Sequence, residues 1–244
     1  MHLFGLIGNP LSHSFSKKYF AEKFEKERLL DFHYENFQLE SINELEKVLR
    51  LPGLQGLNVT IPYKEKVLSF LDESSNEVKK IGACNCIKIK NGKLIGYNTD
   101  AIAFKNSLLK KLNFSLNLHA LVLGTGGASK AVQFVLEELK INFQLVSRNS
   151  SVNQLSYTQL DESVMQKCKL IINKTPLGMF PMQNGMPLIP YELLNSENFL
   201  FDLIANPAQT EFLKRGKEKG ATIQNGLDMF QIQAEESWKI WNKD

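Results

Sequence analysis

Three polar segments in the first hundred residues carry side chains that could bind an anion and transfer a proton. In the first, residues 8–16, Ser14 and Ser16 stand two positions apart. On extended backbone their hydroxyls would point to the same side and could both donate to a carboxylate. The alternative is a polar turn that caps the helix expected to follow.

The other two segments, residues 58–64 and 96–100, contribute a lysine and an aspartate. Pro62 suits the first turn of a helix, which would place Lys64 in the positive field of a helix N-terminus. That field disfavours a second positive charge and would ease proton transfer near neutral pH. Asp100 begins another expected helix, either as a cap or facing Lys64 across a cleft. A pair of this kind could hold a substrate hydroxyl and move its proton, so we predict it as the catalytic pair; a solvated lysine and a helix cap are the alternative.

A glycine turn near the middle of the chain is typical of a dinucleotide site. It lies between an apolar run, residues 120–123, and an amphipathic segment that starts at Gly127. Gly124 would allow the tight turn, Gly126 would let a pyrophosphate approach the backbone, and the small Ala128 would let the helix pack closely. The free N–H groups of the helix would face the phosphates. A purely structural turn is the alternative.

The end of the next expected strand indicates which dinucleotide is bound. A site for NAD typically has an acidic residue there, which accepts a hydrogen bond from the ribose 2′-hydroxyl. Residues 145–149 contain no acid but do contain Arg148, whose planar guanidinium suits a 2′-phosphate. We therefore predict NADP rather than NAD, with a solvated surface arginine as the alternative.

The elements that must position these groups follow from the hydrophobic pattern. Short apolar runs alternate with amphipathic segments, which predicts βαβ units with parallel sheets, and the pattern restarts near residue 115. We therefore predict an α/β protein with two domains and a boundary at about residues 100–115, and a hairpin over 85–96 around Asn91 and Gly92. The other expected strands are 2–8, 31–39, 55–61, 119–123, 142–147, 169–173, 199–203 and 221–224; the expected helices are 14–28, 41–51, 100–112, 127–139, 209–219 and 226–241; and 173–190 is expected to be a long loop.

Charge and cysteine content exclude several other classes of protein. The net charge is only +3 over 244 residues and the basic residues are scattered, so we expect no nucleic-acid partner. No apolar run approaches the roughly 18 residues that span a bilayer, and residues 1–15 lack the basic start of a signal peptide, so we expect a cytoplasmic protein with no membrane partner. Cys84, Cys86 and Cys168 fit neither a disulfide framework nor a metal site, and we expect them to be small buried side chains.

Seven segments, taken in order, make the chain similar to the shikimate dehydrogenase family. Each segment is weak alone, and the specificity of the resemblance lies in the ordered set, which extends over nearly the whole chain. The segments are GNPLSHSFS (8–16), NVTIPYK (58–64), GACN (82–85), GYNTD (96–100), GTGGA (124–128), NKTPLGM (173–179) and GLDMFQIQA (226–234).

The resemblance implies the reversible, NADPH-dependent reduction of 3-dehydroshikimate to shikimate, in the pathway to chorismate and the aromatic amino acids. It implies an N-terminal α/β substrate domain of residues 1–112, completed by a C-terminal helix, 226–244, that returns to it. It also implies a Rossmann-like NADP-binding domain of residues 113–225, no metal, and a monomer or homodimer.

The resemblance further implies roles for the residues that match the family's motifs. Lys64 and Asp100 would be catalytic, and Ser14, Ser16 and Thr60 would bind the substrate carboxylate. The substrate-binding set would be Ser14, Ser16, Thr60, Lys64, Asn85, Asp100 and Gln233, and the cofactor-binding set would be Gly124, Gly126, Gly127, Ala128, Arg148, Thr175, Met179 and Gly226.

Several positions depart from the family pattern. Ala205 replaces a common tyrosine and removes a hydroxyl that often lines the cleft, which leaves substrate affinity open. A quinate/shikimate dehydrogenase is therefore a second enzyme reading. A nucleotide-sensing protein without turnover is a third, although a sensor would need neither Lys64 nor Asp100. The remaining departures are Lys17 for proline, Ser147 and Asn149 around Arg148 for asparagine and threonine, and Cys86 for threonine.

Overall fold

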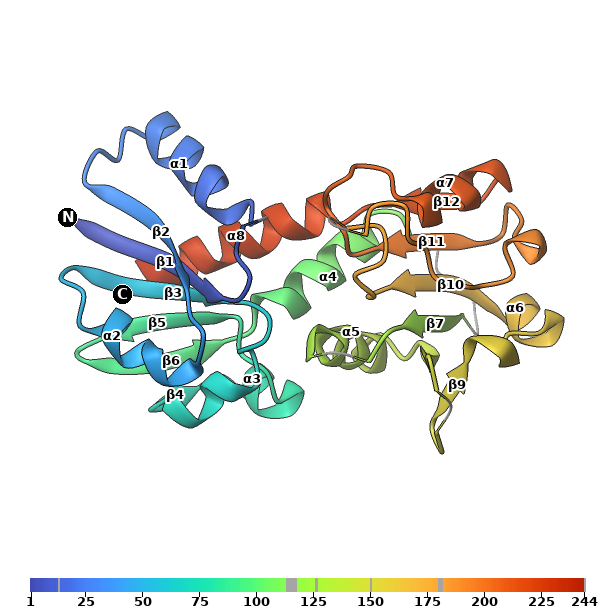
Figure 1. The fold of residues 1–244 in the computed structure, drawn as a ribbon, viewed down its shortest axis with the longest axis horizontal. Coiled ribbons are helices and arrows are strands. Elements are labelled where there is room, and N and C mark those ends of the chain that lie inside the picture. Colours follow the sequence, from blue (N-terminus) through green and yellow to red (C-terminus); the bar gives the residue numbers. More distant parts are fainter. Residues whose placement is uncertain (13, 113–117, 126, 150, 180–181, 244) are drawn as a thin grey trace. The chain divides into compact units, whose positions relative to one another are not determined.

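The computed structural model describes residues 1–244 apart from 13, 113–117, 126, 150, 180–181 and 244, and it contains two compact units (Figure 1). Unit 1 comprises Met1–Asp100 and Gln233–Asp244, and unit 2 comprises Ala101–Ile232. Helices α4 (Thr99–Leu109) and α8 (Leu227–Asn242) therefore each contribute residues to both units. The domain borders predicted at residues 112/113 and 225/226 lie near the ends of these same helices and stay a prediction.

Unit 1 is built on a mixed sheet rather than the parallel sheet predicted for it. The hairpin at Asn91 and Gly92 reverses the chain, and both residues have the positive φ angles, 54° and 76°, that a two-residue hairpin turn needs. In sheet order the strands are β2 (Phe32–Gln38), β1 (His2–Gly8), β3 (Leu54–Val59), β5 (Cys86–Lys90), β6 (Lys93–Tyr97) and β4 (Glu73–Ser74).

The pairing directions in unit 1 bring several strand ends to one edge. Strand β1 runs parallel to both β2 and β3, whereas β5 is antiparallel to β3 and to β6. The segments that follow β1, β3 and β6 and the segment that precedes β5 therefore lie at the same edge of the sheet.

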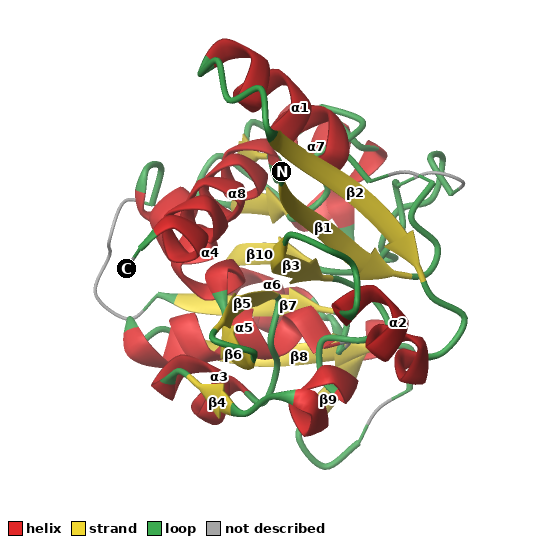
Figure 2. Ribbon diagram, turned by 90° about the vertical axis from the view of Figure 1, so that its left-hand side faces the viewer, coloured by secondary structure: helices red, strands yellow, loops and turns green. Residues whose placement is uncertain are grey.

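Alternating side chains give the sheet of unit 1 two apolar faces. Phe4 lies on the face covered by α1 (Ser16–Lys26) and by α8, whereas Ile7 lies on the opposite face, in the cluster that includes Leu45 of helix α2 (Leu45–Leu49). Helices α1 and α8 lie on the same side of the sheet (Figure 2). The opposite face is also covered by α3 (Asn76–Ile81) and by short 3-10 turns at Ile42–Glu44 and Lys66–Phe70.

The C-terminal helix is anchored in unit 1 by Trp241, which confirms the predicted return of this helix. The indole ring stacks on Phe4 with ring centroids 4.8 Å apart, and its Nε1 donates to the carbonyl of Ile87 at 3.0 Å. A Cβ atom at Gly56 of β3 would lie 2.3 Å from Nε1 of Trp241, so the strand needs a glycine to admit the ring.

We expect Gly56→Ala to lower the free energy of unfolding by about 1–3 kcal/mol, the range for overpacking a well-filled core. The added methyl would press on a ring that is held on its other sides by Phe4 and by the Ile87 carbonyl. Denaturant unfolding followed by tryptophan fluorescence measures the change. Stability within about 0.5 kcal/mol of the parent would show that the ring can move aside.

Unit 2 contains the all-parallel sheet predicted for the second half of the chain. The predicted helices of this half are also present, as α5 (Gly127–Glu138) and α7 (Glu211–Glu218), and a short helix α6 (Glu162–Lys167) was not predicted. The strands, in sheet order, are β12 (Thr222–Gln224), β11 (Phe199–Asp202), β10 (Cys168–Asn173), β7 (His119–Leu123), β8 (Asn142–Ser147) and β9 (Gln154–Ser156).

The strand order of unit 2 contains one switch point. The chain proceeds from β7 outward through β8 and β9, and then returns to β10 on the other side of β7 and continues to β11 and β12. In open α/β sheets, ligands bind outside the carboxyl ends of the strands at such a point. The fold alone therefore indicates a ligand site between the segments that follow β7 and β10.

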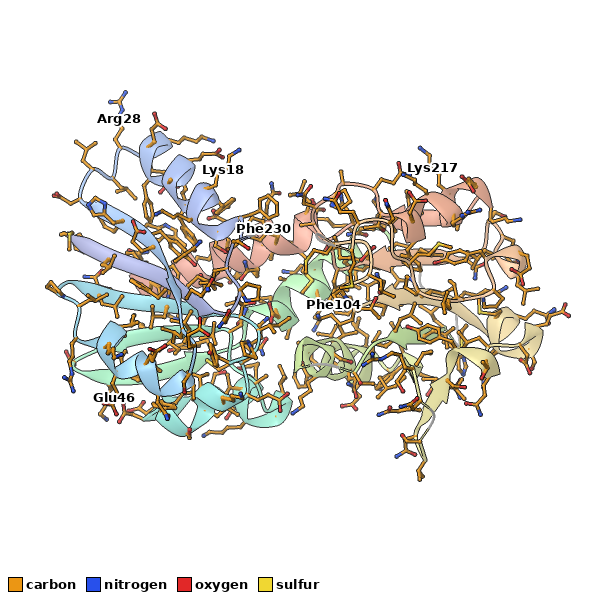
Figure 3. The ribbon with its side chains drawn as sticks, viewed as in Figure 1. Lys18, Arg28, Glu46, Phe104, Lys217 and Phe230 are labelled. Atoms are coloured by element: carbon orange, nitrogen blue, oxygen red, sulfur yellow. The ribbon has the colours of Figure 1, made fainter. Side chains whose placement is uncertain are left out.

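Both faces of this sheet are packed by apolar side chains. Phe104 of α4, labelled in Figure 3, stacks on Phe201 of β11 with centroids 5.3 Å apart. Leu121 belongs to a separate cluster with residues of α6 and α7. The labelled charged side chains, such as Lys18, lie on the outside. Residues 174–190 contain no helix or strand where the structure describes them, as the loop prediction states.

Candidate active site

Polar side chains gather at one edge of the sheet in unit 1, which we call the polar edge. Thr60 and Lys64 follow β3, and Ser14 follows β1, which runs parallel to β3. Asn85 immediately precedes β5, whose first residue, Cys86, is opposite Asn58 near the end of β3. The sheet therefore brings together residues from three separate parts of the chain.

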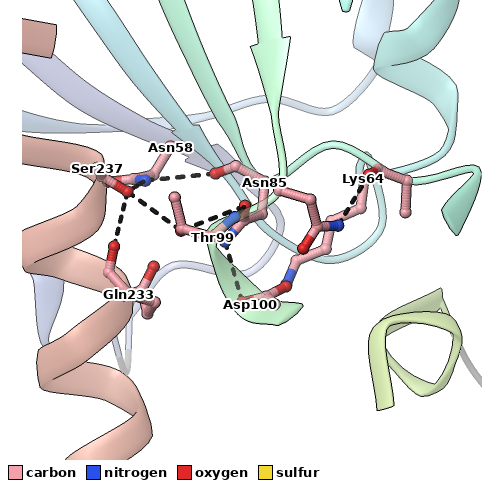
Figure 4. A network of polar contacts seen from close by, with 9 residues as sticks. Asn58, Lys64, Asn85, Thr99, Asp100, Gln233 and Ser237 are labelled. Carbon is pink, nitrogen blue, oxygen red and sulfur yellow. Dashed lines mark hydrogen bonds and ion pairs between the residues drawn. The ribbon is translucent and has the colours of Figure 1, made fainter. Parts of the chain in front are cut away.

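The structure places Lys64 and Asp100 in direct contact at the polar edge. Lys64 Nζ donates to Asp100 Oδ2 at 2.6 Å, and the two side chains are 14% and 10% exposed (Figure 4). Lys64 does not lie in a first helical turn as predicted, because the backbone forms turns over residues 61–65 and the 3-10 turn begins only at Lys66. The helix-field argument is therefore wrong, and the ion pair positions this ammonium group instead.

Asn85 orients the aspartate. Its Oδ1 accepts the backbone N–H of Thr99 at 2.6 Å, and a backbone N–H can only donate, so the amide oxygen must face Thr99. The Nδ2 group is consequently turned to Asp100 and donates to Oδ1 at 3.0 Å (Figure 4). Each carboxylate oxygen of Asp100 thus has its own donor, Asn85 on Oδ1 and Lys64 on Oδ2.

Ser14 and Ser16 lie near each other but not as the extended-strand argument expected. Phe15 between them has helical angles, φ −85° and ψ −12°, and Ser16 is the first residue of α1. Ser14 Oγ accepts the N–H of Ser16 at 3.3 Å, which is a polar turn at the helix start; the N-cap of α1 is Phe15, so neither serine caps the helix as the alternative expected. Thr60 lies beside the end of β1, because a Cβ at Gly8 would be only 2.4 Å from its Cγ2.

Gln233 is on α8 within unit 1, and a buried network that the sequence did not predict ties its backbone to the polar edge. Ser237 Oγ donates to the carbonyl of Gln233 at 2.9 Å and accepts from Asn58 Nδ2 at 2.8 Å. Tyr34 donates to Asn58 Oδ1 at 2.9 Å. Thr99 Oγ1 lies 3.3 Å from Ser237 Oγ (Figure 4). Two features of the sequence could have indicated this network: Asn58 lies in a buried strand, and Ser237 lies on the apolar side of the last helix.

The cysteines are buried, as predicted, and they are all free. Burial raises the pKa of the Cys84 thiol to about 12 and that of the Cys168 thiol to about 11. These thiols therefore stay protonated near neutral pH and behave as small packing groups. Among the described residues, no group of three or more His, Cys, Asp or Glu side chains is placed to hold a metal ion.

In unit 2, the glycine turn and the loop after β10 meet at the switch point. Gly124 begins the turn after β7 with a φ of 100°, a conformation that side-chain-bearing residues rarely adopt. A Cβ there would lie 3.3 Å from both the Thr175 N atom and the Lys174 carbonyl carbon. Gly124 and Thr175, both predicted to contact a cofactor, are thus adjacent.

The remaining predicted cofactor residues also lie after strands of unit 2, two of them beyond the same turn and the others after further strands. Gly127 and Ala128 form the first residues of α5, directly after the turn; Gly126 lies outside the described residues. Arg148 is exposed just after β8, and its positive charge offsets part of the rise that burial causes in the pKa of Tyr157. Gly226 follows β12, where a Cβ would lie 2.1 Å from the Leu203 carbonyl oxygen, so only glycine fits.

Met179 is 39% exposed in the loop after β10. Together with the residues named above, it lies after a strand end on the side we call the carboxyl edge of unit 2. A phosphorylated dinucleotide needs a glycine turn that lets it approach, free N–H groups at a helix start and a basic side chain, and this edge has all three.

No described helix has both the length and the apolar character required to cross a membrane.

The chain is similar over nearly its whole length to proteins of known family. Residues 6–87 match the family described as the shikimate dehydrogenase substrate binding domain. The chain is 36% identical over 256 residues to a shikimate dehydrogenase (NADP⁺) of Methanococcus maripaludis, an alignment that covers 98% of this chain and 91% of that protein.

Solved structures agree with the sequence comparison. A crystal structure of shikimate dehydrogenase in complex with NADP⁺ superposes with a TM-score of 0.87 at 31% identity, covering 100% of this chain and 91% of that one. A shikimate 5-dehydrogenase of Thermus thermophilus in complex with NADP(H) and shikimate gives a TM-score of 0.85 at 32% identity, covering 99% and 94%.

Proposed function

Because this chain belongs to the family of NADP⁺-dependent shikimate dehydrogenases, we propose that it interconverts 3-dehydroshikimate and shikimate with NADPH and NADP⁺. The reaction is a step of the shikimate pathway to aromatic amino acids. The observation on this chain that supports it best is the Lys64–Asp100 ion pair, 2.6 Å long, at the polar edge of unit 1.

Lys64 acts as the general acid in this proposal. When bound, NADPH supplies the hydride that reduces the substrate carbonyl carbon. Lys64 donates a proton from its ammonium group to the carbonyl oxygen as that oxygen becomes an alkoxide, and it recovers a proton from solvent afterwards. In the oxidation direction the neutral amine accepts the same proton from the hydroxyl.

Asp100 keeps the lysine in place and can accept a hydrogen bond from a neighbouring ring hydroxyl. Its two oxygens are oriented by Lys64 and Asn85, so the free lone pairs point in defined directions. Asn85 and Gln233 are the further candidates for binding ring hydroxyls. Positioning of this kind lowers the barrier because the groups need not reorganise during reaction.

In our proposal, the substrate carboxylate is bound by Ser14, Ser16 and Thr60. Their hydroxyls follow β1 and β3, whose parallel ends lie at the polar edge. Ala205 provides no hydroxyl in place of the tyrosine that is common in the family.

The site residues on unit 2 fit NADP. Gly124, the N-terminus of α5 and Thr175 surround the switch point, and Arg148 follows the neighbouring strand β8, where the adenosine ribose lies in sites of this type. The three free, buried cysteines suit a reducing compartment, so a cytoplasmic location completes the proposal, with a monomer or homodimer as its assembly.

We expect Arg148→Ala to weaken NADPH binding by about 10–100-fold, the loss that follows when a charge-assisted hydrogen bond to phosphate is removed. NADH lacks the 2′-phosphate, so its Kd should change less than twofold. Fluorescence titration with both nucleotides measures the two values. An equal loss for NADH and NADPH would show that Arg148 does not contact the phosphate.

The experiment that tests the function is a spectrophotometric assay with shikimate and NADP⁺. Production of NADPH is expected, with NAD⁺ giving a much lower kcat/KM. Quinate in parallel separates this activity from that of a quinate/shikimate dehydrogenase. Tight NADP⁺ binding with no oxidation of either hydroxy acid would instead support the nucleotide-sensing alternative.

A further inference from the structure

Asp202 is a fully buried carboxylate at the carboxyl edge of unit 2 for which the reaction has no direct use. It ends the apolar strand β11 and is 0% exposed. Its oxygens accept hydrogen bonds from three separate segments. Thr210 Oγ1 donates to Oδ2 at 2.6 Å, and the Ile204 N–H and Asn173 Nδ2 donate to Oδ1, each at 3.1 Å.

The carboxylate holds the Asn173 amide in the orientation that Thr175 requires. Asn173 Oδ1 accepts both the N–H of Thr175, at 3.0 Å, and its hydroxyl, at 2.7 Å. The backbone N–H can only donate, so the amide oxygen must face Thr175 and Nδ2 must face Asp202. A carboxylate, which only accepts, satisfies Nδ2 in this orientation.

This chain of contacts ends at the glycine turn. Thr175 N lies 3.3 Å from the position of a Cβ on Gly124, so the loop that Asn173 shapes forms the wall beside the turn. Thr210, the other partner of Asp202, caps α7 by accepting the Leu213 N–H at 3.4 Å. Asp202 thus connects the loop after β10 to the start of a helix.

We propose that Asp202 is a positioning residue of the cofactor site, and that NADP binds more tightly when this carboxylate is ionised than when it is protonated. The inference rests on the proposed function, because it takes Gly124 and Thr175 to be part of the cofactor site. Asp202 itself touches neither substrate nor cofactor; it acts through Asn173.

The direction of the pH dependence follows from the surroundings of Asp202. Burial raises its pKa to about 6, while its three hydrogen bonds and the positive charge of Lys174 lower it. Tyr191 also faces it, and burial and the negative charge of Asp202 both raise the pKa of that phenol; Arg215 and Glu211 of α7 lie beside Tyr191. The carboxylate therefore gains its proton as the pH falls through about 6.

Protonation removes the charge that strengthens the bond from Asn173. The proton is best placed on Oδ2, because Thr210 Oγ1 can rotate its hydrogen away and accept, whereas the two donors on Oδ1 cannot. Oδ1 of the neutral acid still accepts a hydrogen bond from Asn173, but this bond is about half as strong as the bond to the ionised carboxylate. The loop beside Gly124 is held less firmly, so NADP affinity falls below pH 6.

The test uses Asp202→Asn, which has the shape and hydrogen-bonding pattern of the protonated acid. Its Oδ1 can still accept from Asn173 and Ile204, and its Nδ2 can donate to Thr210. The Kd for NADP⁺ is measured by titration calorimetry at pH 8 and pH 5 for the parent and the variant. We expect the variant to bind about tenfold more weakly at pH 8 and within twofold of the parent at pH 5.

Two controls isolate the role of Asp202. The 2′-phosphate of NADP⁺ also titrates in this range, but both proteins meet the same ligand at each pH, so the ratio of their Kd values cancels that effect. Glu211→Gln removes a carboxylate from the adjacent helix start, where it pairs with Lys214, and should leave the ratio at one at both pH values.

A ratio of variant to parent Kd that is the same at pH 8 and pH 5 would overturn the proposal, because a merely structural role predicts it. If Asp202→Asn does not fold, the test is the binding of NAD⁺, which lacks the 2′-phosphate, to the parent protein. The Kd for NAD⁺ should rise about tenfold from pH 8 to pH 5. An unchanged Kd would refute the inference. A parent that binds NADP⁺ with the expected pH dependence but does not oxidise shikimate would contradict the proposed function and leave the role of Asp202 standing.

Discussion

Lys64→Ala should lower kcat for shikimate oxidation by about 10²–10⁴, the range for loss of a general acid or base. The alanine removes the group that exchanges a proton with the substrate oxygen and leaves Asp100, which is only 10% exposed, without its cation. Binding of NADPH should change less than twofold, because the proposed cofactor residues belong to unit 2 and Lys64 belongs to unit 1. Steady-state kinetics and a fluorescence titration with NADPH measure the two quantities.

Lys66→Ala is the matched control for this variant. It deletes the same side chain two positions along, where the lysine is exposed and lies 5.9 Å from the ring centroid of Tyr63. Its kcat should stay within twofold of the parent. A Lys64→Ala enzyme with nearly full kcat would remove this lysine from the mechanism, whereas a similar loss in both variants would point to a general effect of charge on this segment.

Asp100→Asn should lower kcat by about 10² or more although it preserves the shape of the side chain. The reason is the fixed orientation of Asn85, whose Nδ2 faces Asp100 Oδ1 because its oxygen is held by the Thr99 N–H. An asparagine at position 100 must turn its own NH₂ either to Asn85 Nδ2 or to Lys64 Nζ, and both are donors. One buried hydrogen bond is lost in either orientation, and Lys64 also loses its counter-charge.

Glu73→Gln offers a matched control for the aspartate. Glu73 also pairs with a lysine of unit 1, Lys93, at 2.9 Å, but this pair lies on the surface. Neutralising Glu73 should therefore leave kcat unchanged. The double variant Lys64→Ala, Asp100→Asn should be no slower than the slower single variant, because groups that act as one unit are not additive. Multiplicative losses would show that the two residues act independently.

Most elements of the fold could be predicted from local patterns. Strand β8 was predicted at the observed residues, and Ser41 and Glu44 form a capping box where the helix expected over 41–51 begins. The short elements β4, β9, α3 and α6 were not predicted, because segments of two to six residues carry too little periodicity to stand out.

The errors at the site have a common cause, which is that backbone direction was inferred from a single local rule. Pro62 is compatible with a helix start, but residues 61–65 form turns, so Lys64 is positioned by its contact with Asp100 and not by a helix. Ser14 and Ser16 flank Phe15, whose helical angles break the alternation that an extended segment would have. In both cases a strand has just ended and the chain must turn within a few residues. The path of that turn depends on the neighbouring strands and cannot be inferred from the local residues alone.

The family, the alternation of strands and helices, and the residue types able to bind phosphate or move a proton follow from the sequence, because they depend on ordered motifs and on periodicity within short segments. Three features became visible only in the folded protein: the mixed pairing in unit 1, the orientation of the Asn85 amide, and the buried partners of Asp202 and Ser237. Each of these depends on groups that lie far apart along the chain. A buried donor or acceptor takes its direction from whichever distant partner the packed fold places beside it.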